Sequence, residues 1–185
     1  ISAKEVEIDK SNNILVGKGS VKISDSIGRI INAENVKYEK SKEFLLVEGS
    51  VEIFDIEGNV LVTEKATYDK INELITTFDA TEIKLNNGYN VKSNNIIYNT
   101  EAKIVSSNLE TILTDADGNI VNVSMFQYQV TQNLFSSVGN IKVVDNKNNK
   151  YFFKELHIDT KKKEMIGSDV SVLLDQKNFG VKPEN

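Results

Sequence analysis

Apolar and polar residues alternate along most of this chain. Val51 and Ile53 flank Glu52, and the stretch 65–69 (KATYD) follows the same rule. A period of two residues is typical of a β-strand with one dry face and one wet face. β-branched and aromatic residues dominate these stretches, and Asn and Gly recur too often for a helical stripe. The pattern therefore predicts strands throughout and no long helix.

The alternation itself repeats every 30 residues. Six units align without gaps, and they begin at Ala3, Ala33, Thr63, Ser93, Val123 and Phe153. Five columns of this alignment are apolar in every unit, and in the unit 33–62 they hold Val36, Tyr38, Leu45, Ile53 and Leu61. A fixed long period of this kind indicates a repeat architecture.

Turn signals divide each unit into halves of about 15 residues. One type is rich in Lys, Asn and Glu, as in residues 10–13 and 40–43, and the other is Asp-x-x-Gly, as in residues 25–28 and 55–58. An Asp three residues before a Gly is typical of a type I turn followed by a left-handed glycine. Each unit is therefore predicted to be two antiparallel strands, which gives about twelve strands in all.

Most units carry a residue that favours a bend near the middle of a strand. This column holds Gly19, Gly49 and Gly139, with Asp79 and Asp169 in two other units. Because glycine inside a strand marks a bend or bulge, we expect the strands to fold over and enclose the apolar columns between two layers. The predicted fold is all-β, an antiparallel bent β-jellyroll or V-shaped sandwich built from six 30-residue repeats. A propeller or a parallel β-helix fits the turn spacing poorly.

Composition narrows the possible functions. The chain has 185 residues, 39% hydrophobic content and a net charge of -5, so it can bury a core but does not attract nucleic acid or anionic membranes. Arg29 is the only arginine, which argues against a phosphate or nucleic-acid enzyme. The absence of cysteine excludes disulfides and thiolate metal sites.

The repeat domain is expected to cover residues 1–182. Pro183, the only proline, cannot donate to a strand ladder, so residues 183–185 are predicted to begin a linker towards a missing C-terminal region. The start at Ile1 suggests that processing removed a targeting segment. The end strands should leave unpaired edges, and Val6 and Ile8 in the first strand form the predicted partner edge.

Little in the sequence predicts catalysis or metal binding. His157 is the only histidine, and the sequence supplies no partner to orient it as a base. The Asp column could in principle hold calcium, but turn chemistry explains it better. The lysines at 161–163 are interpreted as a solvated loop rather than a lipid headgroup site. We therefore predict no catalytic residue, no metal and no cofactor.

One apolar column leaves a choice open. Tyr38, Tyr68, Tyr98 and Tyr128 share this column, and their rings could either pack in a core or form the wall of a lipid-sized groove. Periodicity alone favours packing.

The pattern A-E-N-V-x-Y-(D/E), followed by L-x-x-x-G-x-V-x-I-x-D-x-x-G-N, resembles the OstA-like repeat of lipopolysaccharide transport proteins. The similarity covers essentially the whole chain: it is carried by residues 33–39 and 45–59 and echoed at 3–9, 15–28, 66–69 and 139–145. Asp79 and Leu109 replace the bend glycine and Leu85 replaces the turn Asp, which puts the local bends in question. Residues 168–185 look like the junction between the periplasmic domain and the barrel of the outer-membrane lipopolysaccharide-assembly protein (LptD type). The soluble bridge protein (LptA type) is the alternative member.

This resemblance implies a periplasmic protein, attached to the outer membrane if a barrel follows. It would conduct the lipid A acyl chains of lipopolysaccharide along an apolar groove and dock to an LptA-type bridge protein by strand addition. An LptD-type chain would also have its own C-terminal outer-membrane barrel and an LptE-type lipoprotein as partners. A structural or adhesive β-repeat protein with a filled core is the alternative from another class.

The resemblance favours the groove interpretation of the tyrosine column over simple packing. The groove candidates are Val36, Tyr38, Leu45, Ile53, Leu61, Ala66, Tyr68, Ile75, Ile83, Val91, Ile96, Tyr98, Val105, Leu113, Val121, Phe126, Tyr128, Phe135 and Val143.

Overall fold

The computed structural model describes residues 1–175, and this part of the chain consists almost entirely of antiparallel strands. The helical turns η1 (Lys40–Lys42) and η2 (Val130–Gln132) are the only helical elements in this range, and no helix in it could span a membrane. The predicted all-β antiparallel fold is therefore confirmed. The linker predicted at 183–185 and the last residues of the predicted repeat domain, 176–182, lie outside the described residues.

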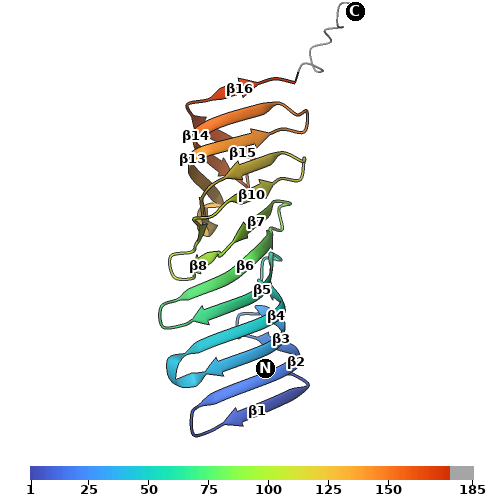
Figure 1. Ribbon diagram of the computed structural model, residues 1–185, viewed down its shortest axis with the longest axis vertical. Helices are drawn as coiled ribbons and strands as arrows, with labels where there is room; N and C mark the ends of the chain where they lie inside the picture. Colours follow the sequence, from blue (N-terminus) through green and yellow to red (C-terminus); the bar gives the residue numbers. More distant parts are fainter. Residues whose placement is uncertain (176–185) are drawn as a thin grey trace, which may run out of the picture.

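The strands form one sheet in which neighbours in sequence are mostly neighbours in space. Figure 1 shows them stacked as successive rungs along the long axis, from the N-terminal strands at one end to the C-terminal strands at the other. They are β1 (Glu5–Asp9), β2 (Ile14–Ser24), β3 (Ile30–Glu39), β4 (Phe44–Phe54), β5 (Val60–Asp69), β6 (Leu74–Lys84), β7 (Asn90–Asn94), β8 (Ile97–Asn99), β9 (Ile104–Ser107), β10 (Thr111–Thr114), β11 (Ile120–Val123), β12 (Phe126–Gln129), β13 (Leu134–Val144), β14 (Lys150–Asp159), β15 (Glu164–Ser168) and β16 (Ser171–Leu173).

The sheet has 16 strands rather than about twelve because four of the predicted strands are interrupted at the bend. They appear as β7 and β8, β9 and β10, β11 and β12, and β15 and β16. Left-handed residues lie in two of these interruptions, Asn95 with φ 51° and Asp169 with φ 52°. Because such a residue turns the backbone away from its partner, ladder pairing stops there and resumes in the other layer.

Gly49 illustrates how an unbroken strand crosses the bend. It adopts φ +81°, and the register of β4 against β5 shifts between Glu48 and Val51. A Cβ at Gly49 would lie 2.8 Å from the Cβ of Glu34, so both the backbone conformation and the close approach require glycine here. Asp79 adopts φ 61°, so the third unit keeps its bend without glycine.

The bend divides the sheet into two layers. Residues 74–76 of β6 pair with β8, whereas residues 80–84 pair with β7. In the same way, β13 pairs with β12 at one end and with β11 at the other. One layer therefore contains β8, β9 and β12, and the other contains β7, β10 and β11.

Apolar side chains fill the space between the layers as two separate clusters. The smaller cluster lies in the first units and includes Val21, Val36 and Val51. The larger one includes Leu113 and the rings of Phe126 and Phe135, which stack with centroids 5.3 Å apart. Each end of the molecule therefore has a dry core of its own.

Hydroxyl side chains line the bend between these clusters. Three buried columns at the bend hold Ala33, Val47 and Val51 in the second unit but Thr63, Thr77 and Thr81 in the third. The Oγ1 of Thr81 lies 3.1 Å from that of Thr63 and 2.8 Å from that of Thr77. The backbone N–H of Ile96, at the gap between β7 and β8, donates to Thr77 Oγ1 at 3.0 Å. This hydroxyl thus satisfies a buried donor where the strand is interrupted.

We predict that Thr77→Val lowers the free energy of unfolding by about 1–3 kcal/mol, because the buried Ile96 N–H loses its acceptor. Thr76→Val, one residue away on the opposite face, should change it by less than about 0.5 kcal/mol. Urea denaturation followed by circular dichroism measures both. Equal stability of the two variants would show that the hydroxyl is dispensable.

Candidate functional site

Two adjoining cavities lie between the layers. The first has a volume of about 170 Å³ and is lined from both layers, for example by Val91 and Leu113 on one side and Val105 and Phe126 on the other. The second, of about 150 Å³, lies towards the N-terminus and is lined by residues such as Leu45. Arg29, Ile53 and Ile75 line both cavities and mark the point where they meet. Together the cavities form one discontinuous apolar groove, to which we refer below as the inner groove.

Most of the groove candidates line these cavities. In the first cavity these residues are Ile53, Leu61, Ile75, Ile83, Val91, Ile96, Tyr98, Val105, Leu113, Phe126, Tyr128 and Phe135. The second cavity adds Leu45, Ala66 and Tyr68. Val36, Val121 and Val143 are buried core residues that line neither cavity, and the half-buried Tyr38 also lines neither. A role of the lining residues in lipid binding stays a prediction.

Tyr68, Tyr98 and Tyr128 of the tyrosine column line the inner groove, and the hydroxyls of Tyr68 and Tyr128 contact polar side chains. Tyr68 Oη donates to Glu73 Oε2 at 3.1 Å, and Tyr128 Oη lies 3.3 Å from Thr160 Oγ1. Burial raises the pKa of the Tyr98 and Tyr128 hydroxyls, so they stay neutral in the physiological range. The three tyrosines therefore contribute to the wall of the inner groove.

Sequence reasoning missed the lip of the inner groove. Arg29, Asp55 and Glu57 line the first cavity, together with a set of asparagines. Leu85 lines it as well, although the sequence marked it only as the exception in the Asp column. That exception was a usable signal, because leucine in place of a turn Asp indicates that the position contacts an apolar space.

The turn Asp residues accept hydrogen bonds within their own turns, as their sequence pattern predicted. Asp55 Oδ1 accepts from the backbone N–H of Glu57 at 2.9 Å and of Asn59 at 2.8 Å, and its Oδ2 accepts from Asn59 Nδ2 at 2.7 Å. Within residues 1–175, no three acidic or histidine side chains cluster as metal ligands would. In the lysine loop, Lys162 Nζ pairs with Asp159 Oδ2 at 3.4 Å.

The structure gives His157 two side-chain partners that the sequence did not supply. Its Nδ1 lies 2.9 Å from Ser136 Oγ, and its Nε2 lies 3.0 Å from Glu155 Oε1. Ser136 is the cross-strand partner of His157 in the β13–β14 register, a relation that the sequence did not reveal. The three side chains line none of the cavities described in residues 1–175, so they lack an enclosed site for a substrate.

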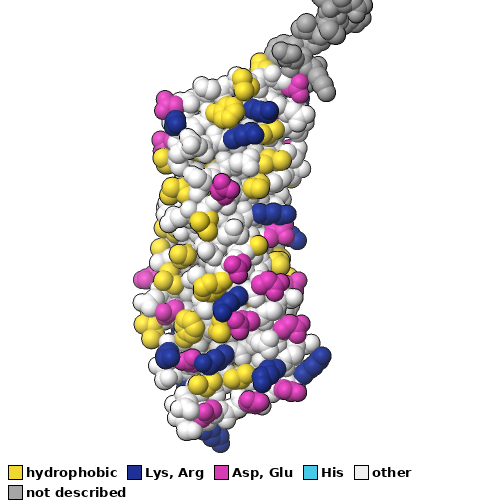
Figure 2. Space-filling view, viewed as in Figure 1, with side chains coloured by type: hydrophobic (Ala, Val, Ile, Leu, Met, Phe, Trp, Pro, Cys, Tyr) yellow, Lys and Arg dark blue, Asp and Glu magenta, His cyan; other side chains and the backbone are white. Residues whose placement is uncertain are grey.

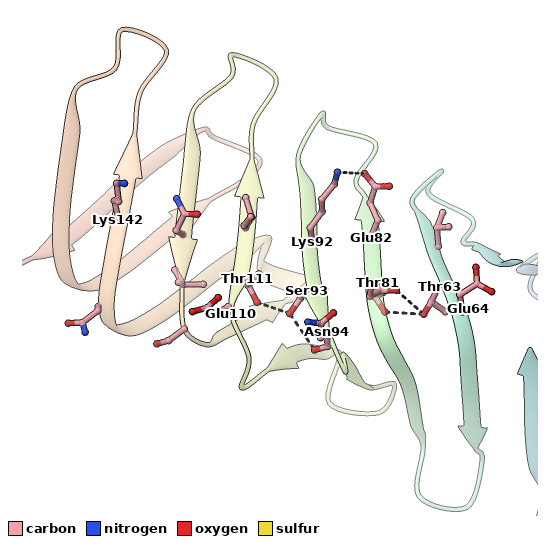
Figure 3. A pocket seen from close by; sticks show the side chains of 17 residues that line it. Thr63, Glu64, Thr81, Glu82, Lys92, Ser93, Asn94, Glu110, Thr111 and Lys142 are labelled. Carbon is pink, nitrogen blue, oxygen red and sulfur yellow. Dashed lines mark hydrogen bonds and ion pairs between the residues drawn. The ribbon is translucent and has the colours of Figure 1, made fainter. Parts of the chain in front are cut away.

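A larger hollow of about 850 Å³ lies on the opposite face of β5, β6, β7 and β10 (Figure 3). It is lined by the residues that alternate with the inner ones, such as Glu82 beside Ile83 and Lys92 beside Val91. The Lys92 Nζ and Glu82 Oε1 atoms are 3.7 Å apart and span two strands, as Figure 3 shows. Its lining mixes charged and amide side chains with apolar ones such as Val62 and Ile112.

Neither a family model nor a curated protein matches this chain. Among solved structures, it is similar to LptH from Pseudomonas aeruginosa, the LptA-homologous periplasmic component of a lipopolysaccharide transport device. Sequence identity is 14%, the TM-score is 0.35, and the match covers 80% of this chain and 94% of LptH. The TCP10 domain of CPAP from Danio rerio matches with 10% identity and a TM-score of 0.21, over 92% of this chain and 99% of that domain. Both TM-scores are too low to carry an argument about function.

We predict that Leu113→Ala lowers the free energy of unfolding by about 2–5 kcal/mol, because it removes a buried side chain and enlarges the first cavity. Leu113 is 1% exposed, whereas the neighbouring Ile112 is 43% exposed on the opposite face. Ile112→Ala is the matched control and should cost less than about 1 kcal/mol. Similar midpoints of chemical denaturation for the two variants would contradict the assignment of inner and outer faces.

Proposed function

We propose that this protein carries lipopolysaccharide in the periplasm by holding its lipid A acyl chains in the inner groove. The observation that carries this proposal is the apolar lining that both layers contribute, from Ile23 in the first unit to Phe135 in the fifth. The resemblance of the repeat to the OstA-like pattern supports the same ligand. No bond is made or broken in this function, so it requires no catalytic residue.

The physical need for such a groove follows from the cost of hydrating an acyl chain. At about 0.8 kcal/mol per CH₂, a chain of a dozen carbons costs on the order of 10 kcal/mol to expose to water. An apolar channel removes most of this cost. Because each unit repeats the same columns, no position along the channel needs to bind the chain much more tightly than the next, which favours movement along it.

The layers must separate for a chain to enter. The cavities, of about 170 and 150 Å³, are smaller than the roughly 300–1,000 Å³ of typical small-molecule sites. The interrupted middle strands suit this opening, since ladder pairing with neighbouring strands stops at the bend between β7 and β8 and between β9 and β10. The outer surface need not change, and Figure 2 shows it carrying scattered charges of both signs between apolar side chains.

Docking by strand addition is proposed for the open edge of β1. This strand pairs only with β2, and all five of its residues are exposed, with Val6 at 49% and Ile8 at 65%. An exposed apolar edge is a template for a strand of another chain. An LptA-type bridge protein is the proposed partner at this edge.

The choice between the two family members remains part of the proposal. The LptD-type interpretation depends on residues 168–185, most of which lie outside the described part of the chain. A barrel and an LptE-type lipoprotein would be partners only in that case. The sequence that follows residue 185 in the gene distinguishes the two, because amphipathic barrel strands would identify the LptD type and a stop codon the LptA type.

The small volume of the cavities also favours a second candidate, a structural or adhesive β-repeat protein with a filled core. The stacked rings of Phe126 and Phe135 show that part of the inner space is closely packed. A calorimetric titration with a long-chain fatty acid separates the two functions. Saturable binding supports the carrier, and its absence supports the filled core.

We expect a photo-crosslinking residue placed at Tyr68 or Leu113 to capture lipopolysaccharide in cells, because both side chains line the inner groove. The matched control is Lys65, whose side chain pairs on the other face with Glu48 at 2.9 Å. Adducts are detected by a mobility shift with an antibody against the carbohydrate. Capture at Lys65 alone would contradict a lipid-filled groove.

We expect Val6→Pro to abolish docking to an LptA-type protein while leaving the fold intact. The Lys40 N–H donates to the Asn13 carbonyl, so residues 13, 15 and 17 direct their backbone groups towards β3. Residues 14, 16 and 18 therefore bond to β1 through its residues 5, 7 and 9, and the Val6 N–H points away from β2. Glu7→Pro instead removes a donor of the β1–β2 ladder and should unpair the first hairpin. Co-purification measures docking, and amide exchange reports the hairpin. Unchanged docking of Val6→Pro would point to a different edge.

A further inference from the structure

Arg29 lies at the point where the two cavities of the inner groove meet. It lines both of them, and no lysine or second arginine lines either cavity in the part of the chain that the structure describes. Its side chain is 35% exposed, so it faces both the apolar space and the solvent at the lip. The lip also carries the carboxylates of Asp25, Asp55 and Glu57, so Arg29 is the single cation there among acidic and amide side chains. A cation at the mouth of a cavity whose interior is apolar suits an amphiphile with an anionic group.

The column of Arg29 shows that the arginine replaces a structural residue. Equivalent positions hold Asn59, Asn119 and Asn149, and each of these side chains donates to the Asp four residues earlier at 2.7 or 2.8 Å. Their Oδ1 atoms also accept a backbone N–H from the next Asp-type turn, such as that of Asn86 from Asn59 at 2.9 Å. Arginine has no acceptor atom, so its side chain cannot accept a backbone N–H from the second turn.

The guanidinium keeps most of its donors for another group. Its Nε donates to Asp25 Oδ2 at 2.5 Å, which fixes the orientation of the fork. Within residues 1–175, its Nη atoms have no protein hydrogen-bond acceptor. Four of the five N–H groups of the fork are therefore left to an acceptor that the described chain does not provide, and a phosphate or carboxylate matches their geometry.

The charges around Arg29 set how strongly it can attract an anion. Partial burial acts to raise the pKa of the Asp25 carboxyl, but its contacts with Arg29 hold that pKa below the usual value, so Asp25 is ionised and offsets part of the positive charge. Arg29 and Tyr98 line the same cavity. Burial raises the pKa of Tyr98, and the charge of Arg29 opposes this shift. Asp55 is already saturated by three N–H donors.

We propose that Arg29 binds the anionic group of an amphiphile, a phosphate or a carboxylate, whose acyl chain lies in the inner groove, and that Asp25 positions the guanidinium. This inference rests on the proposed function, since it requires a chain in the groove. It adds the headgroup chemistry and the position along the groove at which that headgroup sits. Each captured molecule would thus lie with its charge at the lip between the first and second cavities.

The test uses three amphiphiles with the same 14-carbon chain, namely tetradecyl phosphate, tetradecanoate and tetradecanol, below their aggregation limits. Binding is measured by isothermal titration calorimetry. Arg29→Asn introduces the residue found at the equivalent positions 59, 119 and 149 and should weaken binding of the preferred anion by about tenfold, the order expected for lost charge-assisted hydrogen bonds. Its affinity for tetradecanol should stay within about twofold, because the apolar lining is unchanged. The anion that loses more affinity identifies the headgroup as a phosphate or a carboxylate.

Two further variants separate recognition from folding. Asp25→Asn keeps the Oδ1 acceptor of the turn but replaces the Oδ2 that accepts from Arg29 Nε with an amide group that cannot accept. Loss of this positioning should weaken binding of the anion and leave tetradecanol binding within about twofold, whereas a merely structural role would weaken binding of all three ligands. Lys65→Asn removes a cation from the outer face and should change nothing.

Equal affinities of the wild type and Arg29→Asn for both anions, with tetradecanol still bound, would overturn the role of Arg29 alone. Failure of the wild type to bind any of the three ligands would overturn the proposed function and this inference with it.

Discussion

The architecture depends on one constraint: a strand must bend sharply and still keep its apolar side chains on the inside. Because side chains alternate, a bend that shifts the phase by one residue would turn every later apolar side chain outward. In this chain the apolar positions change phase at the bend as well, so the change in the sequence pattern offsets the change in the backbone. On β3 the buried residues Ala33 and Val36 are three positions apart, and the register against β2 shifts between Lys18 and Val21. The inner face therefore stays apolar on both sides of the bend.

The bend is built differently along the molecule. In the second unit, Gly49 and the apolar residues around it form a continuous bent strand. In the third and fourth units the bend is lined by hydroxyls, and the Ser93 and Thr111 side chains lie 2.7 Å apart where the strands are interrupted. A hydroxyl can satisfy a freed backbone donor, as Thr77 does for Ile96, so the ladder can break without leaving that donor unpaired. The middle of the molecule is thereby the section best suited to a change in the spacing of the layers.

The sequence was sufficient to predict the fold class, because the 30-residue period and the turn chemistry at positions such as Asp55 and Gly58 act locally. It also ranked Leu113 and Phe126 among the inner residues, since burial follows the alternation. It could not separate Val121, which is sealed in the core, from Val91, which lines a cavity, because that difference depends on the width between the layers.

Contacts across the sheet were equally out of reach of the sequence. The partners of His157 depend on the β13–β14 register, and the position of Arg29 at the lip depends on where the two layers meet.

The central claim is that an acyl chain occupies the space between the two layers. The most direct measurement is paramagnetic relaxation enhancement from a fatty acid that carries a nitroxide near the end of its chain. The account predicts that the methyl signals of inner residues such as Leu61, Ile83 and Val105 broaden. Those of the outward neighbours Val62 and Ile112 should remain sharp. Broadening confined to the outward set, or none at saturating ligand, would contradict it.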